Sequence, residues 1–266
     1  NETIAVKGDR DRVVEIKETL WGPVAEKPLM GHPVALRWIA LDPDAVDLGL
    51  LQMDQARTVR DAIAVANRAG GPPNNVVLAD ADGHIAWTFM GKIPVRRGFD
   101  GSVSVSWADG RTGWNGFIAP DELPRIVDPP SGYLVSANHR MVGEEYPHVI
   151  GHAFANGYRA YRITERLRDK DRFHETDLLA LQLDTTAQVY EFYQDLVKRL
   201  LSESVIEGNP DLADVRRAVE AWEGRADSDS KGFGLLVAFR RTLAASVFAP
   251  FLQSCREQDA GFVYGG

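Results

Sequence analysis

Apolar and polar residues alternate with a period of two near the start of the chain. Residues 3–7 (TIAVK) and 13–17 (VVEIK) flank a turn of sequence GDRD, which predicts a β-hairpin with one face buried. A further run at residues 34–40 is apolar on both faces except at Arg37, and this pattern predicts an inner strand. An arginine in an inner strand needs a partner or a pocket for its charge.

A helical period follows this run. Asp42 is a good N-cap residue for a predicted helical region. Apolar residues recur in that region at Val46, Leu50, Met53 and Ala56. A second helix is predicted over residues 58–68, with a stop signal of two glycines and two prolines at residues 70–73. Strand-like runs at residues 76–79 and 85–89 then predict another hairpin around a turn at residues 80–83.

The rest of the chain changes character twice. Residues 97–130 are rich in Gly, Asp, Trp and Pro and lack a period, which predicts a long loop with Trp107, Trp114 and Phe117 as anchors. Later segments have a helical period. They are residues 158–167, 177–183, 189–202, 212–222 and 235–251. Strands first and helices later predict an α+β fold. We expect a sheet-rich part over residues 1–157, a helical part packing on it over 158–256, and a tail over 257–266.

Composition and charge narrow the class of protein. The chain has 44% hydrophobic and 26% charged residues, which is typical of a globular protein. A net charge of -8 and the absence of a basic face argue against a nucleic-acid partner. No window approaches about 18 uninterrupted apolar residues, so we expect no membrane-spanning segment. The single cysteine, Cys255, excludes an internal disulfide and a thiolate metal cluster, and it leaves the periplasm open as a compartment.

The segment SGYLVSANHRMVGEEYP, residues 131–147, carries the clearest candidate chemistry. A turn at residues 131–132 leads into an extended apolar run at residues 133–135, and a polar tip follows at residues 136–140. Polar tips at the ends of strands are common places for binding and catalytic groups. The structural alternative is a strand that leaves the core and turns.

Four other patterns favour structural roles. Residues 80–83 (DADG) resemble the start of a calcium loop, but the closing bidentate acid is absent, so a hairpin turn is favoured. His148 and His152 have a metal-ligand spacing, but a proline and a glycine beside them argue against a helix there. Residues 102–106 alternate Ser and Val without a nucleophile elbow, which indicates an exposed-face strand. Cys255 has no histidine with a reason to lie beside it, so a catalytic role is not expected.

Four stretches, taken in order, resemble the β chain of the penicillin acylase family. They are ETIAVKG with TLWGPV (within residues 2–24), ALRWIALDPD with PPNNVVLADADGHIAW (35–44 and 72–87), GWNGFIAPDELPRIVDPPSGYLVSANHR (113–140), and YPHVIG with YRAYRITERL (146–151 and 158–167). The family comprises N-terminal-nucleophile amidohydrolases, among them cephalosporin and acyl-homoserine-lactone acylases. The resemblance implies part of an αββα sandwich followed by a mainly helical second half.

The resemblance also implies a mechanism. In the family, the N-terminal Ser, Cys or Thr of the β chain, freed by autocatalytic cleavage, is the nucleophile, and its own α-amino group is the base. A free α-amine has a pKa of about 7.7–8.0, so a good fraction is neutral and can accept the hydroxyl proton. This chain starts with Asn1 at a point that resembles the interior of a β chain. We therefore expect the nucleophile and the whole α chain to lie upstream, and this chain to be inactive alone.

The resemblance assigns roles to particular residues. Asn138 corresponds to the asparagine that helps to form the oxyanion hole, and Arg162 to the arginine that orients the surroundings of the nucleophile. Ile39 and Asn74 fall near positions that line the acyl pocket. Two positions depart from the family.

At the first departure, Ala153 stands where an acidic residue often ligates a structural calcium, which puts that calcium in doubt. At the second, His139 stands where a second Asn is frequent, which bears on what the tip recognises.

Together these features predict an amide hydrolase of the penicillin acylase type with acyl-enzyme chemistry and no catalytic cofactor. The expected partners are the missing upstream β-chain segment, the α chain of the same precursor, and a small acylated amine, but no nucleic acid and no membrane. The family resemblance favours a bacterial periplasmic or secreted heterodimer. The alternative is a non-catalytic binding or scaffold domain that reuses the acylase fold.

Overall fold

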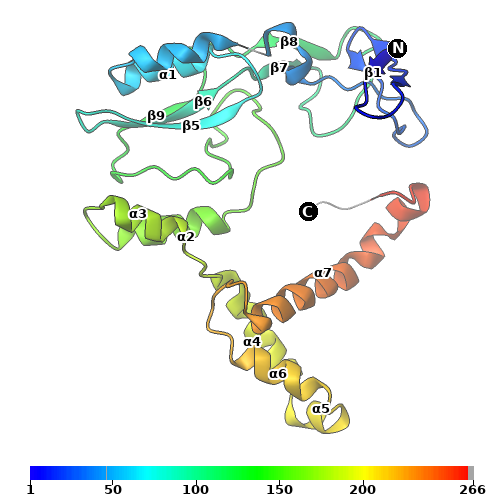
Figure 1. The fold of residues 1–266 in the computed structure, drawn as a ribbon, viewed down its shortest axis with the longest axis vertical. Coiled ribbons are helices and arrows are strands. Elements are labelled where there is room, and N and C mark those ends of the chain that lie inside the picture. Colours follow the sequence, from blue (N-terminus) through cyan, green and yellow to red (C-terminus); the bar gives the residue numbers. More distant parts are fainter. Residues whose placement is uncertain (46, 263–266) are drawn as a thin grey trace. The chain divides into compact units, whose positions relative to one another are not determined.

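The computed structural model describes residues 1–45 and 47–262, so Val46 of the predicted helical region lies outside the described residues. The chain divides into two compact units, Asn1–Asp169 and Lys170–Gly266 (Figure 1). The boundary that the sequence suggested, after residue 157, falls earlier in the chain. Helix α2 (Tyr158–Arg168) therefore belongs to the first unit with the strands.

The first hairpin forms, but its expected buried face does not. Strands β1 (Glu2–Ile4) and β2 (Arg12–Val14) pair antiparallel, with Thr3 opposite Val13. The apolar side chains stay open to solvent, since Ile4 is 52% and Val13 67% exposed. Alternation predicted the pairing correctly, but none of the core clusters found among residues 1–45 and 47–262 includes a side chain of the hairpin. The short strands β3 (Glu18–Thr19) and β4 (Gly22–Pro23) pair next along the chain.

The prediction of an inner strand over residues 34–40 is wrong. Only Ala35 makes a bridge, to Val24, and a 3-10 turn, η1 (Ile39–Leu41), follows. Arg37 does have the partner that its charge requires, since its Nη1 donates to Asp42 Oδ1 at 2.5 Å. Its guanidinium also lies 4.6 Å from the ring centroid of Trp114. Backbone hydrogen bonds from Leu41 N to Trp38 O and from Asp42 N to Ile39 O form the turns that end the run.

The helical region that begins near Asp42 consists of 3-10 turns. These are η2 (Pro43–Ala45) and η3 (Leu48–Gln55), and Asp47 caps η3 through Gly49 N. Asp47 also accepts from Gly70 N at 2.7 Å, which ties η3 to the end of the next helix.

Helix α1 (Val59–Arg68) confirms the second predicted helix. Thr58 and Asp61 form a capping box at its start, as the sequence pattern of such boxes requires.

The main sheet of the first unit has the order β5-β6-β9, antiparallel throughout. Its strands are β5 (Asn74–Ala79), β6 (Ile85–Met90) and β9 (Arg125–Val127), so the second hairpin is confirmed. Helix α1 packs along β5 and β6 (Figure 1). The central strand β6 carries Trp87 and Phe89 into the core beside Ile93.

The predicted long loop contains regular structure that its sequence did not reveal. Strand β8 (Gly113–Phe117) pairs with β7 (Pro94–Arg97), and β9 completes the main sheet. The aromatic anchors are confirmed, because Trp107 lies 6.2 Å from Trp114, which in turn lies 6.3 Å from Phe117 between ring centroids. Residues 102–106 form no strand, which corrects the expectation for this Ser-Val alternation.

The second unit is helical, as predicted. Its elements are α3 (Glu175–Gln182), η4 (Gln188–Tyr190), α4 (Glu191–Leu200), α5 (Glu203–Gly208), α6 (Leu212–Glu220) and α7 (Lys231–Gln258). Val197, Val219, Trp222 and Leu236 form its core. The sequence pattern missed α5, and α7 continues into the first two residues of the expected tail.

Helix α7 differs from expectation in one further respect. Its 28 residues are long and apolar enough, by length and composition, to cross a membrane, and an 18-residue window has a mean hydropathy of 1.5. A search for uninterrupted apolar residues overlooks this window, because Arg240 and Arg241 divide it. The expectation that no stretch qualifies is therefore not confirmed, although length and composition alone are weak evidence for a membrane span.

Candidate active site

The segment that leads to the polar tip belongs to no sheet. Residues 133–136 have no strand assignment, so the expected strand at residues 133–135 is not present. Leu134 packs instead against the core around Trp87, and the Ser131 hydroxyl donates to Tyr133 O at 2.9 Å. Arg168 of α2 donates to the hydroxyl of Tyr133 at 3.2 Å. The segment is thus fixed by side chains on both sides of its backbone.

The backbone at Asn138 turns the side chain outward. Its φ is 62°, in the left-handed region that Asn tolerates better than most residues. Ala137 before it is buried, whereas Asn138 is exposed. The Asn138 carbonyl accepts a hydrogen bond from Ala155 N at 2.8 Å, which fixes the turn to the segment that precedes α2. The amide side chain therefore stands on an anchored backbone at the surface of the first unit.

Arg159, in the first turn of α2, holds this side chain directly. Its Nη2 donates to Ala137 O at 2.7 Å and to Asn138 Oδ1 at 3.1 Å. Arginine can only donate, so the contact fixes which end of the amide faces the guanidinium. The Nδ2 group then points away from Arg159, and within the described residues it donates to no protein acceptor. The arrangement offers a fixed pair of N–H donors to a ligand.

Arg162, which the resemblance singled out, lies one turn further along α2. The structure pairs it with Glu165, whose Oε2 lies 3.5 Å from Arg162 Nη1. Glu165 also interacts with Tyr161, and their hydrogen bond and the negative charge of Glu165 raise the pKa of the Tyr161 hydroxyl. The sequence analysis did not name Arg159, because its contact with Asn138 joins residues 21 positions apart and leaves no local pattern. The role of Arg162 stays a prediction.

The two residues expected near the acyl pocket lie elsewhere in the first unit. Ile39 is buried in η1 with 7% of its surface exposed. Asn74 opens β5, and its Nδ2 donates to Pro72 O at 3.1 Å. No hydrogen bond or core cluster of the described residues joins either of them to Asn138. Their role as pocket residues stays a prediction.

The histidines around the tip have separate partners. His139 Nδ1 accepts from Ala137 N at 3.4 Å, next to Asn138. His148 lies 3.9 Å from Glu122 Oε2, and His152 Nε2 lies 3.1 Å from the carbonyl oxygen of Asp100. Among the described residues, no group of three or more His, Cys, Asp and Glu side chains could hold a metal ion. The spacing of His148 and His152 therefore does not bring them together on one ligand.

A groove of about 880 Å³ lies on another part of the first unit. Its walls include the aromatic residues Trp21, Phe99, Trp107 and Trp114. Arg37 and Arg96 also line it, and Arg96 donates to Val149 O at 2.8 Å. Burial lowers the pKa of Arg96 from its ordinary value. Asn138 is not among the lining residues, so the tip and this groove are separate features.

The fold and the tip together define the class: an α+β protein that presents a preoriented amide donor beside an arginine. The sequence profile of the Penicillin amidase family matches residues 1–263. The chain belongs to this family, which confirms the resemblance found in its sequence motifs.

Individual relatives agree with this assignment. The Penicillin acylase 2 proenzyme of Pseudomonas sp. (strain SE83) is 32% identical over 93% of this chain and 32% of its own length. The acyl-homoserine lactone acylase QuiP of Pseudomonas aeruginosa is 28% identical over 92% of this chain and 29% of its own. The chain thus spans about a third of the length of the curated relatives that it matches.

A solved structure shows the fold. The thermostable penicillin G acylase from Alcaligenes faecalis superposes with a TM-score of 0.61 at 22% sequence identity. The match covers 86% of this chain and 41% of that chain. The α+β prediction, with the N-terminal-nucleophile hydrolase fold that the resemblance implied, is confirmed at the level of the fold.

Proposed function

We propose that the complete protein containing this chain hydrolyses the amide bond between an acyl group and an amine through an acyl-enzyme. Family membership and two relatives named as acylases support an acylase-type hydrolase. The observation that carries the proposal for this chain is the geometry at Asn138. Its amide oxygen is bound by Arg159, and its N–H groups remain directed outward. A scaffold function would not require this preorientation, so the catalytic function is favoured.

The proposed role of Asn138 is to stabilise negative charge on the substrate carbonyl oxygen. An N-terminal Ser, Cys or Thr outside this sequence adds to the carbonyl carbon, and its proton passes to the α-amino group. The carbonyl oxygen becomes an oxyanion that accepts a hydrogen bond from Asn138 Nδ2. Collapse breaks the C–N bond, and the amine leaves with the transferred proton. Water then cleaves the acyl-enzyme by the same route and releases the carboxylic acid.

Arg159 makes this donor effective. A donor that is already oriented needs no reorganisation when charge develops, and one such donor lowers the barrier by about 2.7–4 kcal/mol. We assign the orienting role to Arg159 because it bonds both Ala137 O and Asn138 Oδ1. Arg162 would influence the site indirectly, through its ion pair with Glu165.

The remaining expectations complete the proposal. The nucleophile, the upstream β-chain segment and the α chain come from the same autocatalytically processed precursor, which forms a periplasmic or secreted heterodimer. Catalysis uses no metal or cofactor, and this chain alone is inactive. The named relatives comprise a penicillin acylase and an acyl-homoserine lactone acylase, so acylated β-lactam nuclei and N-acyl-homoserine lactones are the substrate classes to test first.

Hydrolysis by the complete protein tests the proposal. With a series of acylated β-lactam nuclei and N-acyl-homoserine lactones, we expect equal amounts of carboxylic acid and free amine to appear. In the Asn138→Ala variant, kcat should fall about 10²–10³-fold while the thermal melting temperature stays close to that of the wild type. Wild-type protein without hydrolysis on either series, or an alanine variant with unchanged kcat, would refute it.

A further inference from the structure

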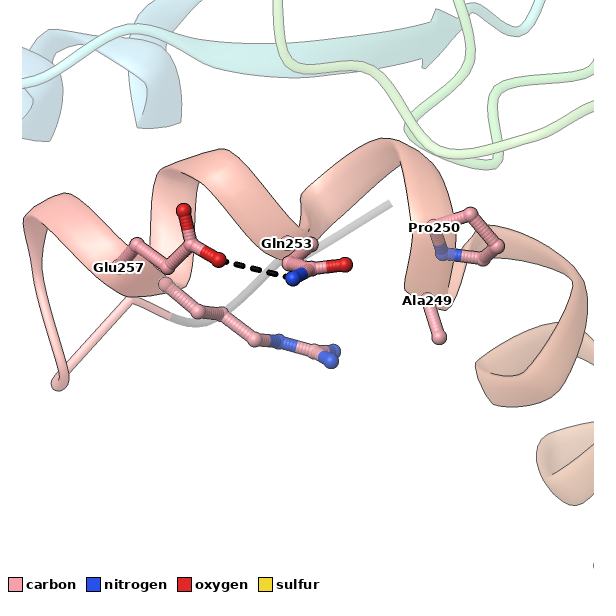
Figure 2. A pocket seen from close by; sticks show the side chains of 5 residues that line it. Ala249, Pro250, Gln253 and Glu257 are labelled. Atoms are coloured by element: carbon pink, nitrogen blue, oxygen red, sulfur yellow. Dashed lines mark hydrogen bonds between the residues drawn. The ribbon is translucent and has the colours of Figure 1, made fainter.

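A shallow hollow of about 460 Å³ lies on helix α7 of the second unit (Figure 2). A single helix supplies its wall, which consists of Ala249, Pro250, Gln253, Arg256 and Glu257. Two of its polar side chains bond each other, since Gln253 Nε2 donates to Glu257 Oε1 at 2.8 Å. Ligand sites instead direct several polar groups toward a bound molecule. We therefore assign no ligand to this hollow, and the contacts around the tip of the first unit carry more chemistry.

The backbone of the tip is bonded by the segment that precedes α2. Ala155 N donates to Asn138 O at 2.8 Å. Asn138 has a φ of 62°, and a residue other than glycine keeps such a conformation only where its surroundings hold it. The hydrogen bonds from Arg159 fix the side-chain amide of Asn138 and the carbonyl before it. The bond from Ala155 fixes the peptide group that follows Asn138, which Arg159 does not reach.

A cation–π contact lies beside this hydrogen bond in both segments. The guanidinium carbon of Arg140 is 5.2 Å from the ring centroid of Phe154. Arg140 is two residues after Asn138, and Phe154 is directly before Ala155. A guanidinium within about 6 Å of an aromatic ring centroid is attracted by the ring. The hydrogen bond and the ring contact therefore join the same two short segments, and each limits the motion that would break the other.

The segment around Phe154 is anchored at both ends. Arg96 Nη1 donates to Val149 O at 2.8 Å, and His152 Nε2 lies 3.1 Å from the carbonyl oxygen of Asp100. Helix α2 begins at Tyr158. Residues 153–156 between these anchors are in no helix or strand, so their position against the tip depends on their own contacts.

We propose that Phe154 and Arg140 are positioning residues that hold the backbone of Asn138, and with it the amide donor, in place for the substrate oxyanion. Phe154 belongs to none of the core clusters found among residues 1–45 and 47–262, so its contact with Arg140 serves the tip rather than the core. Neither residue needs to touch the substrate. The inference rests on the proposed function of Asn138, and it adds the groups that hold its backbone.

Substitutions of Phe154 in the complete acylase test this role. Phe154→Leu removes the ring but keeps an apolar side chain, and Phe154→Tyr keeps the ring and is the matched control. We expect Phe154→Leu and Arg140→Gln each to lower kcat about two- to fivefold with little change in KM, which is the range for the loss of one cation–π contact. Phe154→Tyr should retain most of the wild-type kcat.

Two further measurements separate positioning from a general loss of structure. In an Asn138→Ala background, Phe154→Leu should lower kcat no further, because the donor that it positions is absent. Hydrogen exchange gives a readout without turnover. The Ala155 amide should exchange about two- to fivefold faster in Phe154→Leu and Arg140→Gln than in the wild type and Phe154→Tyr. Amides around Trp87 report the core and should stay protected in all of these proteins.

Three results would overturn the inference. They are a wild-type kcat in Phe154→Leu, equal losses of kcat in Phe154→Leu and Phe154→Tyr, and an undiminished effect of Phe154→Leu in the Asn138→Ala background. If Phe154→Leu also lowers protection around Trp87, Arg140→Gln replaces it, and wild-type exchange of the Ala155 amide in that variant would again overturn the inference. A wild-type kcat in Asn138→Ala would instead refute the proposed function on which the inference rests, so the two failures are distinguishable.

Discussion

The chemistry proposed for the tip depends on two residues that lie 21 positions apart in the sequence. Asn138 alone, at φ 62° on the surface, would sample several side-chain orientations. The two hydrogen bonds from Arg159 remove that freedom, because they fix both the preceding carbonyl and the amide oxygen. The family motifs predicted roles for Asn138 and Arg162, and both roles stay predictions. The motifs did not predict the bond from Arg159, because it depends on how α2 packs against the tip.

Replacing each arginine separately tests this assignment. In the complete acylase, Arg159→Leu should lower kcat by about 10-fold or more, because the Asn138 amide loses its fixed orientation. Arg162→Leu should lower kcat by a smaller factor, and KM should change little in either variant. The measurement is steady-state hydrolysis of an acyl amide by both variants.

A double variant separates orientation from general loss of structure. If Arg159 acts through Asn138, Asn138→Ala combined with Arg159→Leu should lower kcat little more than Asn138→Ala alone. Additive losses, or a larger effect of Arg162→Leu, would contradict the role of Arg159.

At the scale of elements, local signals predicted α1 and the hairpin of β5 and β6. The capping box of α1 is formed by Thr58 and Asp61, which are three positions apart. The hairpin turn is formed by four consecutive residues, DADG at 80–83. Both features can therefore be recognised in short sequence windows. The prediction of a strand over residues 34–40 was wrong because an apolar run does not show whether neighbouring strands are present, and here the run makes one bridge, from Ala35 to Val24. Strands β8 and β9 were missed because their partners, β7 and β6, stabilise sequences without alternation.

An ion pair joins the start of β6 to the end of β9. We expect this pair to make the free energy of unfolding of the first unit depend on pH. His84 Nδ1 lies 2.8 Å from Asp128 Oδ2, and Ile85 N donates to Asp128 Oδ1 at 2.9 Å. The hydrogen bond to Asp128, followed by its charge, raises the pKa of His84. The Ile85 N–H, followed by His84, lowers the pKa of Asp128. The charged pair therefore favours the folded state between these two titrations.

The sign of the His84 contribution follows from its raised pKa. Its stabilisation is fully present below the ordinary histidine pKa of about 6.5 and is lost as pH rises through the folded-state value. His84→Gln should therefore lower the melting temperature more at about pH 5.5 than at about pH 8.5. Thermal melts of both proteins at the two pH values check this. If His84→Gln lowers the melting temperature equally at both pH values, or more at the higher pH, the charged His84–Asp128 pair does not stabilise the folded state.

At the scale of the whole molecule, the sequence predicted an α+β fold and the family, but not where the compact units divide. Helix α2 groups with the strands, because its residues Arg159 and Arg168 bind the tip at Ala137, Asn138 and Tyr133. Long-range contacts of this kind leave no periodic pattern. The exposed apolar side chains of the first hairpin have a related origin, since alternation predicts a face but not what covers it.

The limited span of the chain explains which parts of the proposed mechanism it contains. It matches about a third of each curated relative, and it includes Asn138, the proposed oxyanion donor, with Arg159 bonded to it. The proposed function places the N-terminal nucleophile and its amine base in polypeptide outside this sequence. Activity is therefore expected only from the complete acylase.

Turnover by an Asn138→Asp variant of the complete acylase tests the central role of Asn138 most directly. Aspartate keeps oxygens for Arg159 and tolerates the left-handed backbone, but it removes both N–H donors. We predict an unchanged melting temperature and a kcat about 10²–10³-fold below wild type, comparable with Asn138→Ala. A kcat near the wild-type value would show that hydrolysis does not use the Asn138 amide as an oxyanion donor.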